Sequence, residues 1–420
     1  MRDLLRQRPM RLLFMGNFVS ILGSGMNAAA LSWYVLQLTH SEISLGTLLL
    51  LQTAPMLLLA PFSGVLTDRM DRRHLVMLMD AFRAVIILAT AILSLLQRVN
   101  LIELYAMSMM VSAATSIFWP TTTALTQELT TRDQYVTANT LLMTGAQGGF
   151  LIAGALVGLA YNHVGLGGVL LIDVASYAVS LFCYGFLRRG RHVVAHPEGA
   201  ELGRGILVQF GRDLASCLRF LQGNMYAVLL CTSSSILFAL IFAQNVIVPS
   251  LADRILHSGA VGFGWLNAMS AIGAFLSAGF VKLAVQRAGV KNSVAFSMTL
   301  VGISCLIAPF TGRLGIALLV FFVMGAARGV SVVSVNTGLM QVVPEHYMGR
   351  VQNAFALLSR AAQIVIGLVL GLVAHTVGLV AAFAAMALVY GVGAIAAAAA
   401  GVPPVARPEP VSQTVVAETA

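Results

Sequence analysis

Apolar runs of about 20 residues follow one another along almost the whole chain, separated by short stretches that carry most of the charge. Of the 420 residues, 58% are hydrophobic and only 10% are charged. Because a helix needs about 20 apolar residues to cross a bilayer, this repeated pattern predicts an all-α polytopic membrane protein. We expect twelve spans, near residues 11–37, 43–66, 75–96, 101–125, 135–160, 164–187, 224–250, 260–284, 290–310, 314–340, 351–374 and 377–400.

Basic residues lie between these spans and are distributed unequally over the two sides. Nineteen of the 25 Lys and Arg residues fall in the N-terminus, the even-numbered loops and the tail, whereas the odd-numbered loops hold only Arg98, Arg254 and Arg313. Short loops rich in Lys and Arg stay in the cytoplasm, so both termini are predicted to be cytoplasmic in a bacterial inner (cell) membrane. The net charge of +9 therefore indicates orientation in the lipid bilayer, and we expect no nucleic-acid partner.

The spacing of the spans divides the chain into four parts. The longest segment between spans is rich in charge at its start and amphipathic at its end. The parts are an N-terminal six-helix bundle (1–187), a cytoplasmic linker with an amphipathic helix (188–223), a C-terminal six-helix bundle (224–400) and a disordered cytoplasmic tail (401–420).

A sequence repeat relates the two bundles. The pattern T-x-L-x-Q at 123–127 recurs at 337–341, and the pattern G-x-x-x-G at 154–158 recurs at 367–371. Internal repeats of this kind are typical of transporters built from two related halves. The glycines also predict close helix crossings, since small residues let two backbones approach.

Five charges within six residues interrupt the apolar pattern between the second and third spans. They belong to the stretch 64–73, which reads GVLTDRMDRR. Charges at this density cannot lie in hydrocarbon, so the stretch predicts a tight turn at the cytoplasmic surface. One interpretation is that Asp68 and Asp71 only cap the next helix while the arginines anchor it. The other is that the turn acts in a transport mechanism.

The same stretch resembles the signature loop between helices 2 and 3 of the major facilitator superfamily, G-x-x-x-D-R-x-x-R-R. The matching residues are Gly64, Asp68, Arg69, Arg72 and Arg73. D-x-x-R at 80–83 and V-P-E-x-x-x-G-R-V at 343–351 resemble the branch that contains macrolide and enterobactin exporters. With the spans and the repeat, the resemblance covers essentially the whole chain. It implies two pseudo-symmetric six-helix bundles and drug:proton antiport.

The resemblance also implies a cytoplasmic gate. In this gate, Asp68 faces the N-terminal end of helix 11, which is the positive end of the helix dipole, near Arg350. Arg69 or Arg73 meets Glu128 at the end of helix 4. A carboxylate at a helix start gains roughly 0.3–2 kcal/mol, which is enough to bias a two-state equilibrium without locking it.

Five ionisable residues fall inside spans, where charges are costly and mark functional sites by default. They are Asp80, Arg83, Asp173, Arg328 and Arg360. Asp80 and Arg83 lie three positions apart and can pair on one helix face. Their place one to two turns from the cytoplasm favours a structural latch beside the signature stretch over proton carriage.

The other three charges each have two interpretations. Asp173, near the centre of helix 6 without a charged neighbour in sequence, is the leading candidate for proton coupling, or else a protonated or paired packing residue. Arg328 on helix 10 and Arg360 on helix 11 can reach one central cavity, where arginine forks recognise carboxylates. Alternatively, they pair with Asp173 or with backbone carbonyls.

Further polar side chains predict a roomy amphipathic pocket, because the resemblance implies that helices 1, 4, 7 and 10 line a cavity flanked by helices 2, 5, 8 and 11. Individually, a polar side chain in a span more often forms a hydrogen bond between helices than a contact with a ligand. The residues are Asn17, Asn27, Trp119, Gln147, Gln244, Asn245, Asn336 and Gln363.

These observations favour a secondary active exporter of small amphipathic molecules, such as drugs, siderophores or other acidic metabolites. We expect a monomer driven by the proton gradient, with no metal, no cofactor and no enzymatic activity, because no metal-ligand, phosphate-binding or nucleophile pattern occurs. The alternatives are a lipid or lysophospholipid transporter or flippase-like member of the same superfamily, and a sensor that no longer transports. An ATP-driven pump is excluded because the chain has no G-x-x-x-x-G-K-[ST] loop.

Overall fold

The computed structural model describes residues 2–131, 134–187, 224–343 and 345–400. These residues form helices and no strand. The linker predicted at 188–223 and the tail predicted at 401–420 lie outside the described residues. The elements are α1 (Arg2–Arg6), α2 (Arg8–Thr39), α3 (Glu42–Arg69), α4 (Arg72–Leu95), α5 (Leu101–Leu129), α6 (Tyr135–Gly185), α8 (Met225–Ser250), η2 (Leu251–Ile255), α9 (Gly259–Ile307), η3 (Ala308–Phe310), α10 (Leu314–Val342), α11 (Glu345–Thr376) and α12 (Leu379–Ala399).

Eleven stretches of the described chain are long and apolar enough to cross a membrane. One of them, Thr137–Gly185, has 49 residues, about twice the length that a bilayer requires. It turns back at Gly165, where φ is +64°, a value that favours glycine because it has no Cβ. Since this stretch supplies two crossings, the described residues make twelve, which agrees with the number predicted from the apolar runs.

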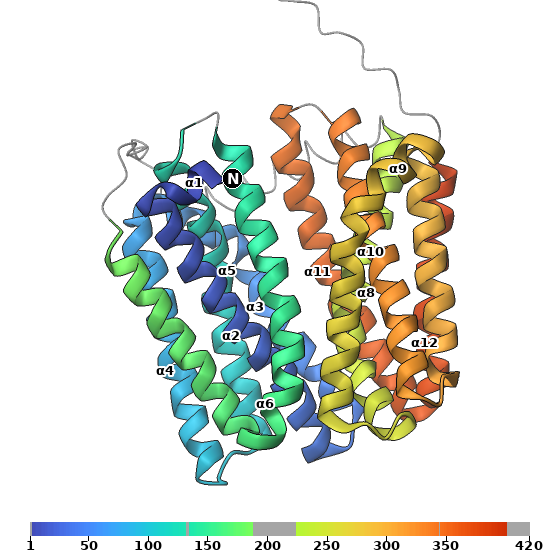
Figure 1. Cartoon of the computed structure of the whole chain (residues 1–420), viewed down its shortest axis with the longest axis horizontal. Helices are drawn as coiled ribbons and strands as arrows, with labels where there is room; N and C mark the ends of the chain where they lie inside the picture. Colours follow the sequence, from blue (N-terminus) through green and yellow to red (C-terminus); the bar gives the residue numbers. More distant parts are fainter. Residues whose placement is uncertain (1, 132–133, 188–223, 344, 401–420) are drawn as a thin grey trace, which may run out of the picture.

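The helices stand in two groups side by side (Figure 1). We call α2–α6 the first bundle and α8–α12 the second bundle. Within the first bundle α2 packs along α6 and α3 along α5, and within the second α9 packs along α10 and α12. Between the bundles, α3 packs against α11 and α6 against α9.

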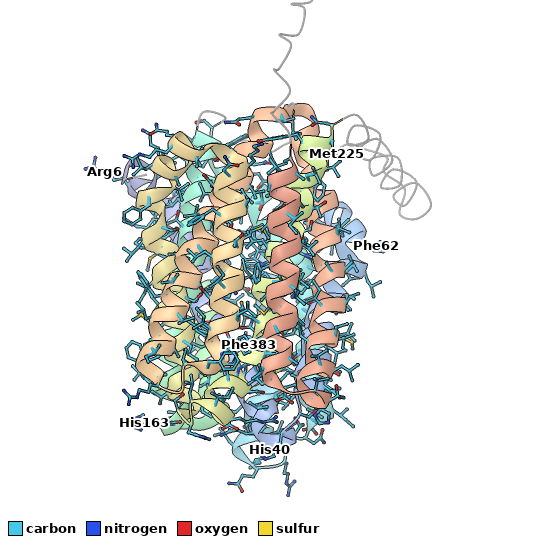
Figure 2. The ribbon with its side chains drawn as sticks, turned by 90° about the vertical axis from the view of Figure 1, so that its right-hand side faces the viewer. Arg6, His40, Phe62, His163, Met225 and Phe383 are labelled. Atoms are coloured by element: carbon cyan, nitrogen blue, oxygen red, sulfur yellow. The ribbon has the colours of Figure 1, made fainter. Side chains whose placement is uncertain are left out.

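The labelled residues identify the two ends of the molecule (Figure 2). Arg6 and Met225 lie at one end, which we call the terminal side because α2 begins there. His40 and His163 lie at the other end, the distal side. The helices α2, α3, α4, α5, α8, α10, α11 and α12 each cross once, whereas α6 and α9 cross twice and turn back at Gly165 and Gly289. In a helix that crosses once, a residue's distance from the helix end gives its depth at about 1.5 Å per residue.

Glycines bring the two bundles into backbone contact near the distal side. A Cβ added to Gly158 of α6 would lie 3.1 Å from Cα of Gly264 in α9. A Cβ on Gly46 of α3 would lie 3.1 Å from the Gly367 carbonyl oxygen of α11, and one on Gly371 would lie 2.7 Å from the Glu42 carbonyl oxygen. The close crossings predicted from the repeated glycines are therefore confirmed.

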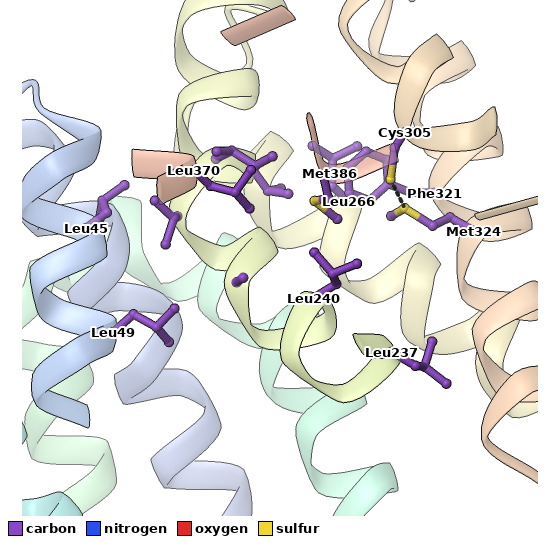
Figure 3. Packing of buried hydrophobic residues seen from close by; sticks show 14 of the residues in the cluster. Leu45, Leu49, Leu237, Leu240, Leu266, Cys305, Phe321, Met324, Leu370 and Met386 are labelled. Carbon is purple, nitrogen blue, oxygen red and sulfur yellow. Dashed lines mark hydrogen bonds between the residues drawn. The ribbon is translucent and has the colours of Figure 1, made fainter. Parts of the chain in front are cut away.

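Apolar side chains fill the space around these crossings. Leu45 and Leu49 of α3 lie beside Leu370 of α11, and Leu237 and Leu240 of α8 continue the cluster into the second bundle (Figure 3). The buried cluster extends across both bundles. The distal halves of the bundles are thus held together by packing as well as by the polar contacts described below.

Candidate functional site

The signature stretch forms a much shorter turn than the sequence predicts. Helix α3 continues to Arg69 and α4 begins at Arg72, so only Met70 and Asp71 connect them. The Asp71 carboxylate accepts a hydrogen bond from the His74 backbone N–H at 3.1 Å, which confirms that Asp71 caps the helix. Gly64 is exposed, and a Cβ there would meet no atom within 4 Å.

The arginines of this stretch bind the rest of the first bundle. Arg72 forms an ion pair with Glu128 at 3.0 Å and donates to the Ala124 carbonyl at 3.3 Å. Arg73 donates to two carbonyls at the end of α6, at 2.8 and 2.5 Å. Of the two arginines expected to meet Glu128, Arg73 instead contacts these carbonyls, because adjacent helical residues point about 100° apart and Arg72 takes the side toward α5. The other alternative, Arg69, stays a prediction. The side chains of Asp68 and Arg69, like that of Arg350, lie outside the described part of the structure.

Asp80 and Arg83 form the predicted ion pair on one face of α4. Ser180 of α6 donates to the other Asp80 oxygen at 2.6 Å, and the Arg83 guanidinium lies 4.2 Å from the Phe118 ring centroid and 4.7 Å from that of Tyr177. The pair is deeper than predicted, about 12 and 16 Å from the start of α4, because that helix begins three residues earlier than expected. Its described partners lie on α5 and α6, so it joins helices of the first bundle.

Asp173 is completely buried and is held by two helices. Asn27 of α2 donates to one carboxylate oxygen at 2.7 Å, and Ser176 donates to the other at 3.3 Å. Next to them, the hydroxyls of Ser24 and Tyr177 lie 2.8 Å apart. Gly23 allows this close approach, because a Cβ there would lie 2.7 Å from the Asp173 carboxylate.

Asp80, Arg83 and Asp173 form one buried charge cluster, in which Arg83 interacts electrostatically with both acids. If all three groups are ionised, the cluster carries one negative charge in excess. A net charge in a low-dielectric interior is costly, and uptake of one proton removes it. The first bundle therefore contains a buried group of side chains whose net charge one proton would neutralise.

Arg328 lies at the middle of α10, within the second bundle. It is 5% exposed and donates to the Gln244 side-chain oxygen of α8 at 2.6 Å. Its guanidinium lies 6.0 Å from the Tyr390 ring centroid of α12. Its described partners all belong to the second bundle, and Asp173 is not one of them. Pairing of Arg328 with Asp173 is thus absent from the described structure.

A second ionic cluster joins the two bundles at the distal side. Glu42, at the start of α3, is completely buried, and its carboxylate lies 2.9 Å from the Arg254 guanidinium of η2 and 3.8 Å from the His375 ring of α11. Arg254 also donates to the His40 carbonyl at 2.8 Å. Because the cluster bridges both bundles where the glycine crossings lie, it closes the distal side.

The remaining predicted pocket residues occupy different environments. Asn17 is buried, and its side-chain oxygen accepts no hydrogen bond from any described residue. Asn336 is exposed and donates to Val332 of its own helix at 3.0 Å. Trp119 packs edge-on against Phe118, and Asn245 is half-buried. The Gln147 side chain lies outside the described part. Arg360 is half-buried and Gln363 is 8% exposed, both on α11.

Sequence reasoning missed the distal cluster. Glu42 follows Ser41 at a helix start and reads as an ordinary terminal acid, and Arg254 reads only as a loop charge. The available signal was topological: both residues and His375 fall at span ends that the alternating topology places on the same side. Among the described residues no group of three or more His, Cys, Asp or Glu is placed to hold a metal ion.

Two bundles related by an internal repeat, closed at one side and containing buried charges within their spans, define a membrane transporter rather than an enzyme. The family model for transmembrane secretion effectors matches residues 3–418. The chain therefore belongs to this family of major facilitator transporters and is a multi-pass membrane protein.

Individual relatives agree with this assignment. The chain is 25% identical over 392 residues to the uncharacterised transporter YfiS of Bacillus subtilis (strain 168), covering 90% of this chain and 89% of YfiS. It is 21% identical over 391 residues to the multidrug efflux pump Tap of Mycolicibacterium fortuitum, covering 91% and 93%. The nucleoside transporter NupG shares the fold, with a TM-score of 0.73 at 16% identity over 93% of this chain and 98% of NupG.

Proposed function

We propose that the protein is a secondary active exporter that moves small amphipathic molecules out of the cytoplasm in exchange for protons. The observation that carries this proposal is the charge cluster of two carboxyls and one guanidinium in the first bundle. Alternating access requires a driving ion to be taken up and released as the bundles rearrange. A cluster with one more carboxylate than guanidinium can bind one proton, so it is suited to take up and release that ion.

The place of Asp173 supports its role as the exchanging group. Asp80 is paired directly with Arg83, whereas the hydrogen-bond donors to Asp173 are an amide and a hydroxyl, neither of which carries a charge. One of these donors, Asn27, belongs to α2, the helix expected to line the transport pathway. A change at α2 can therefore alter the environment of Asp173 directly.

Two observations support the direction of transport. The basic loops favour a cytoplasmic terminal side, so the distal cluster around Glu42 then closes the outer face of the membrane. A relative over most of its length, Tap, is a multidrug efflux pump. In this proposal the signature stretch gates the cytoplasmic side. We expect Asp68→Asn to lower transport without changing membrane insertion.

The proposal is tested with everted inner-membrane vesicles that carry a proton gradient and a pH-sensitive dye. Acidic siderophores, cationic drugs and neutral macrolides are added in turn to wild type, to Asp173→Asn and to Asp253→Asn, a control acid that is exposed at the distal side. We expect one compound class to restore the dye signal in wild type and in the control but not in Asp173→Asn. No response to any class, together with movement of lysophospholipid, would refute the exporter and favour a lipid transporter.

A further inference from the structure

Arg360 differs from Arg83 and Arg328, the other two arginines that lie near the middle of a described span. Arg83 is paired with Asp80, and Arg328 donates to Gln244. Among the described residues Arg360 has no hydrogen bond and no ion pair. It lies 15 residues after the start of α11 and 16 before its end, which places it near the middle of the membrane. An unpaired guanidinium at this depth is costly to keep, which points to a ligand.

The lipid-facing side of α11 is marked by exposed apolar residues at helical spacing. Arg360 lies about 200° around the helix from the first of them, so it points away from lipid. These residues and their exposed fractions are Leu358 (53%), Val365 (60%), Val369 (49%) and Leu372 (53%).

The face that carries Arg360 is the face that meets the first bundle. Gln363, Gly367 and Gly371 follow Arg360 at intervals of three, four and four residues, which is one side of a helix. The two glycines touch α3 near the distal side. Ala356, one turn from Arg360 toward the terminal side on the same face, is exposed. The first bundle therefore covers this face at the glycines and leaves it accessible just beyond Arg360.

Gln363 supplies a second unused polar group at the same place. Its side chain is more than nine-tenths buried, yet it makes no hydrogen bond to any described residue. An arginine fork and an amide NH₂ one turn apart offer several convergent donors, an arrangement that matches the oxygens of a carboxylate. No acid among the described residues occupies these donors.

We propose that Arg360 and Gln363 form the subsite that binds a carboxylate of the transported molecule. This inference rests on the proposed transport function and names its substrate class: amphipathic molecules that carry a carboxylate. In this arrangement the apolar part of the substrate contacts the walls between the bundles while Arg360 neutralises its charge. In this proposal the first bundle binds the exchangeable proton and the second bundle binds the carboxylate of the substrate.

The test uses two fluorescent compounds that differ by one charge, dansyl-leucine and its methyl ester. Transport of each is measured with wild type, Arg360→Gln, Arg360→Lys and the control Arg98→Gln, whose side chain is exposed at the distal side. Because Arg360→Gln removes a charge-assisted hydrogen bond, we expect it to reduce transport of dansyl-leucine at least about tenfold and to leave transport of the ester unchanged. Arg360→Lys keeps the charge without the fork and is expected to lie between.

Other outcomes overturn the subsite. An equal loss of transport for both compounds would mean that Arg360 supports the structure or the transport cycle. An unchanged preference for the acid over the ester would show that Arg360 does not recognise the carboxylate. Gln363→Leu gives a second test that leaves Arg360 unchanged. We expect this variant to lose transport of the acid several-fold and to keep transport of the ester. Competition by lysophosphatidylglycerol without transport of dansyl-leucine would assign the donors to a lipid phosphate instead.

Failure of the proposed function gives a different result. If wild type transports neither compound, the exporter function is refuted, and binding of dansyl-leucine to the purified protein then decides the subsite alone. Binding that Arg360→Gln weakens at least about tenfold supports the subsite. Binding that this variant leaves unchanged, or no binding by wild type, overturns it.

Discussion

The two bundles bury an arginine in comparable places but balance its charge differently. Arg83 and Arg328 each lie near the middle of a helix and face a fully buried tyrosine from the last helix of the same bundle, Tyr177 or Tyr390. These tyrosines are 213 positions apart, the same offset as between the two G-x-x-x-G patterns. The tyrosines therefore occupy equivalent positions of the repeat, whereas the arginines, 245 positions apart, lie on the third crossing of one bundle and the fourth crossing of the other.

The difference lies in the partners of the arginine. In the first bundle Arg83 is surrounded by two carboxyls, whereas in the second Arg328 is bound to a neutral amide. In the proposed function the first cluster changes its charge by one proton, whereas the guanidinium in the second keeps a fixed positive charge. The comparison teaches that each bundle buries an arginine beside a tyrosine, but only the first bundle surrounds that arginine with carboxyls.

The largest effect that tests this difference is expected from Asp80→Ala. It leaves Arg83 buried without its direct partner, which costs about 3–5 kcal/mol of stability. Thermal unfolding of the purified protein in detergent measures the loss. The double variant Asp80→Leu/Arg83→Met should recover most of it, since the uncompensated charge is then gone. A single variant as stable as wild type would show that the pair is not a unit.

The distal cluster is expected to give the next largest effect. Glu42→Gln removes the charge that Arg254 and His375 share, which shifts the equilibrium toward opening at the distal side by about 1–3 kcal/mol. Spin labels placed on α3 and α11 near their distal ends would report a longer distance in the variant. Asp253→Asn, an exposed acid near the same end, serves as the control and should leave the distance unchanged.

A smaller loss is expected from Arg328→Met. This substitution leaves behind one uncharged amide, so we expect a cost of about 1–2 kcal/mol, clearly below that of Asp80→Ala. The same thermal measurement made on both variants compares the bundles directly. Equal losses would contradict the view that only the first bundle depends on a balance of charges.

The smallest difference concerns the two repeated tyrosines. The Tyr177 hydroxyl lies 2.8 Å from that of Ser24, whereas the Tyr390 hydroxyl has no hydrogen bond of normal geometry within the described part of the chain. Tyr177→Phe should therefore cost about 1 kcal/mol, and Tyr390→Phe should be close to neutral. Unfolding of the two variants side by side decides this, and a larger loss for Tyr390→Phe would show that the second bundle depends on a polar contact at that residue.

The sequence predicts the fold closely because its determinants are local. Apolar length sets each span, and the i, i+3 spacing of Asp80 and Arg83 predicts their pair. The turn inside α6 lies at Gly165, within the span predicted at 164–187. The long-range contacts could not be predicted in the same way. Asp173 meets Asn27 across 146 positions, and no local spacing connects Glu42 with Arg254. Arg328 and Arg360 look alike in sequence, and only the packing of their helices shows that Arg328 has a partner and that Arg360 has none among the described residues.

The most direct test of the central claim measures proton coupling through Asp173 in proteoliposomes. Wild type, Asp173→Asn and the control Asp253→Asn are compared for uptake driven by a pH gradient and for exchange of labelled against unlabelled substrate. The account predicts that Asp173→Asn loses the uptake driven by the pH gradient and keeps substrate exchange, because the asparagine keeps a hydrogen-bonding side chain but cannot take up a proton. Full uptake driven by the pH gradient in Asp173→Asn would contradict it.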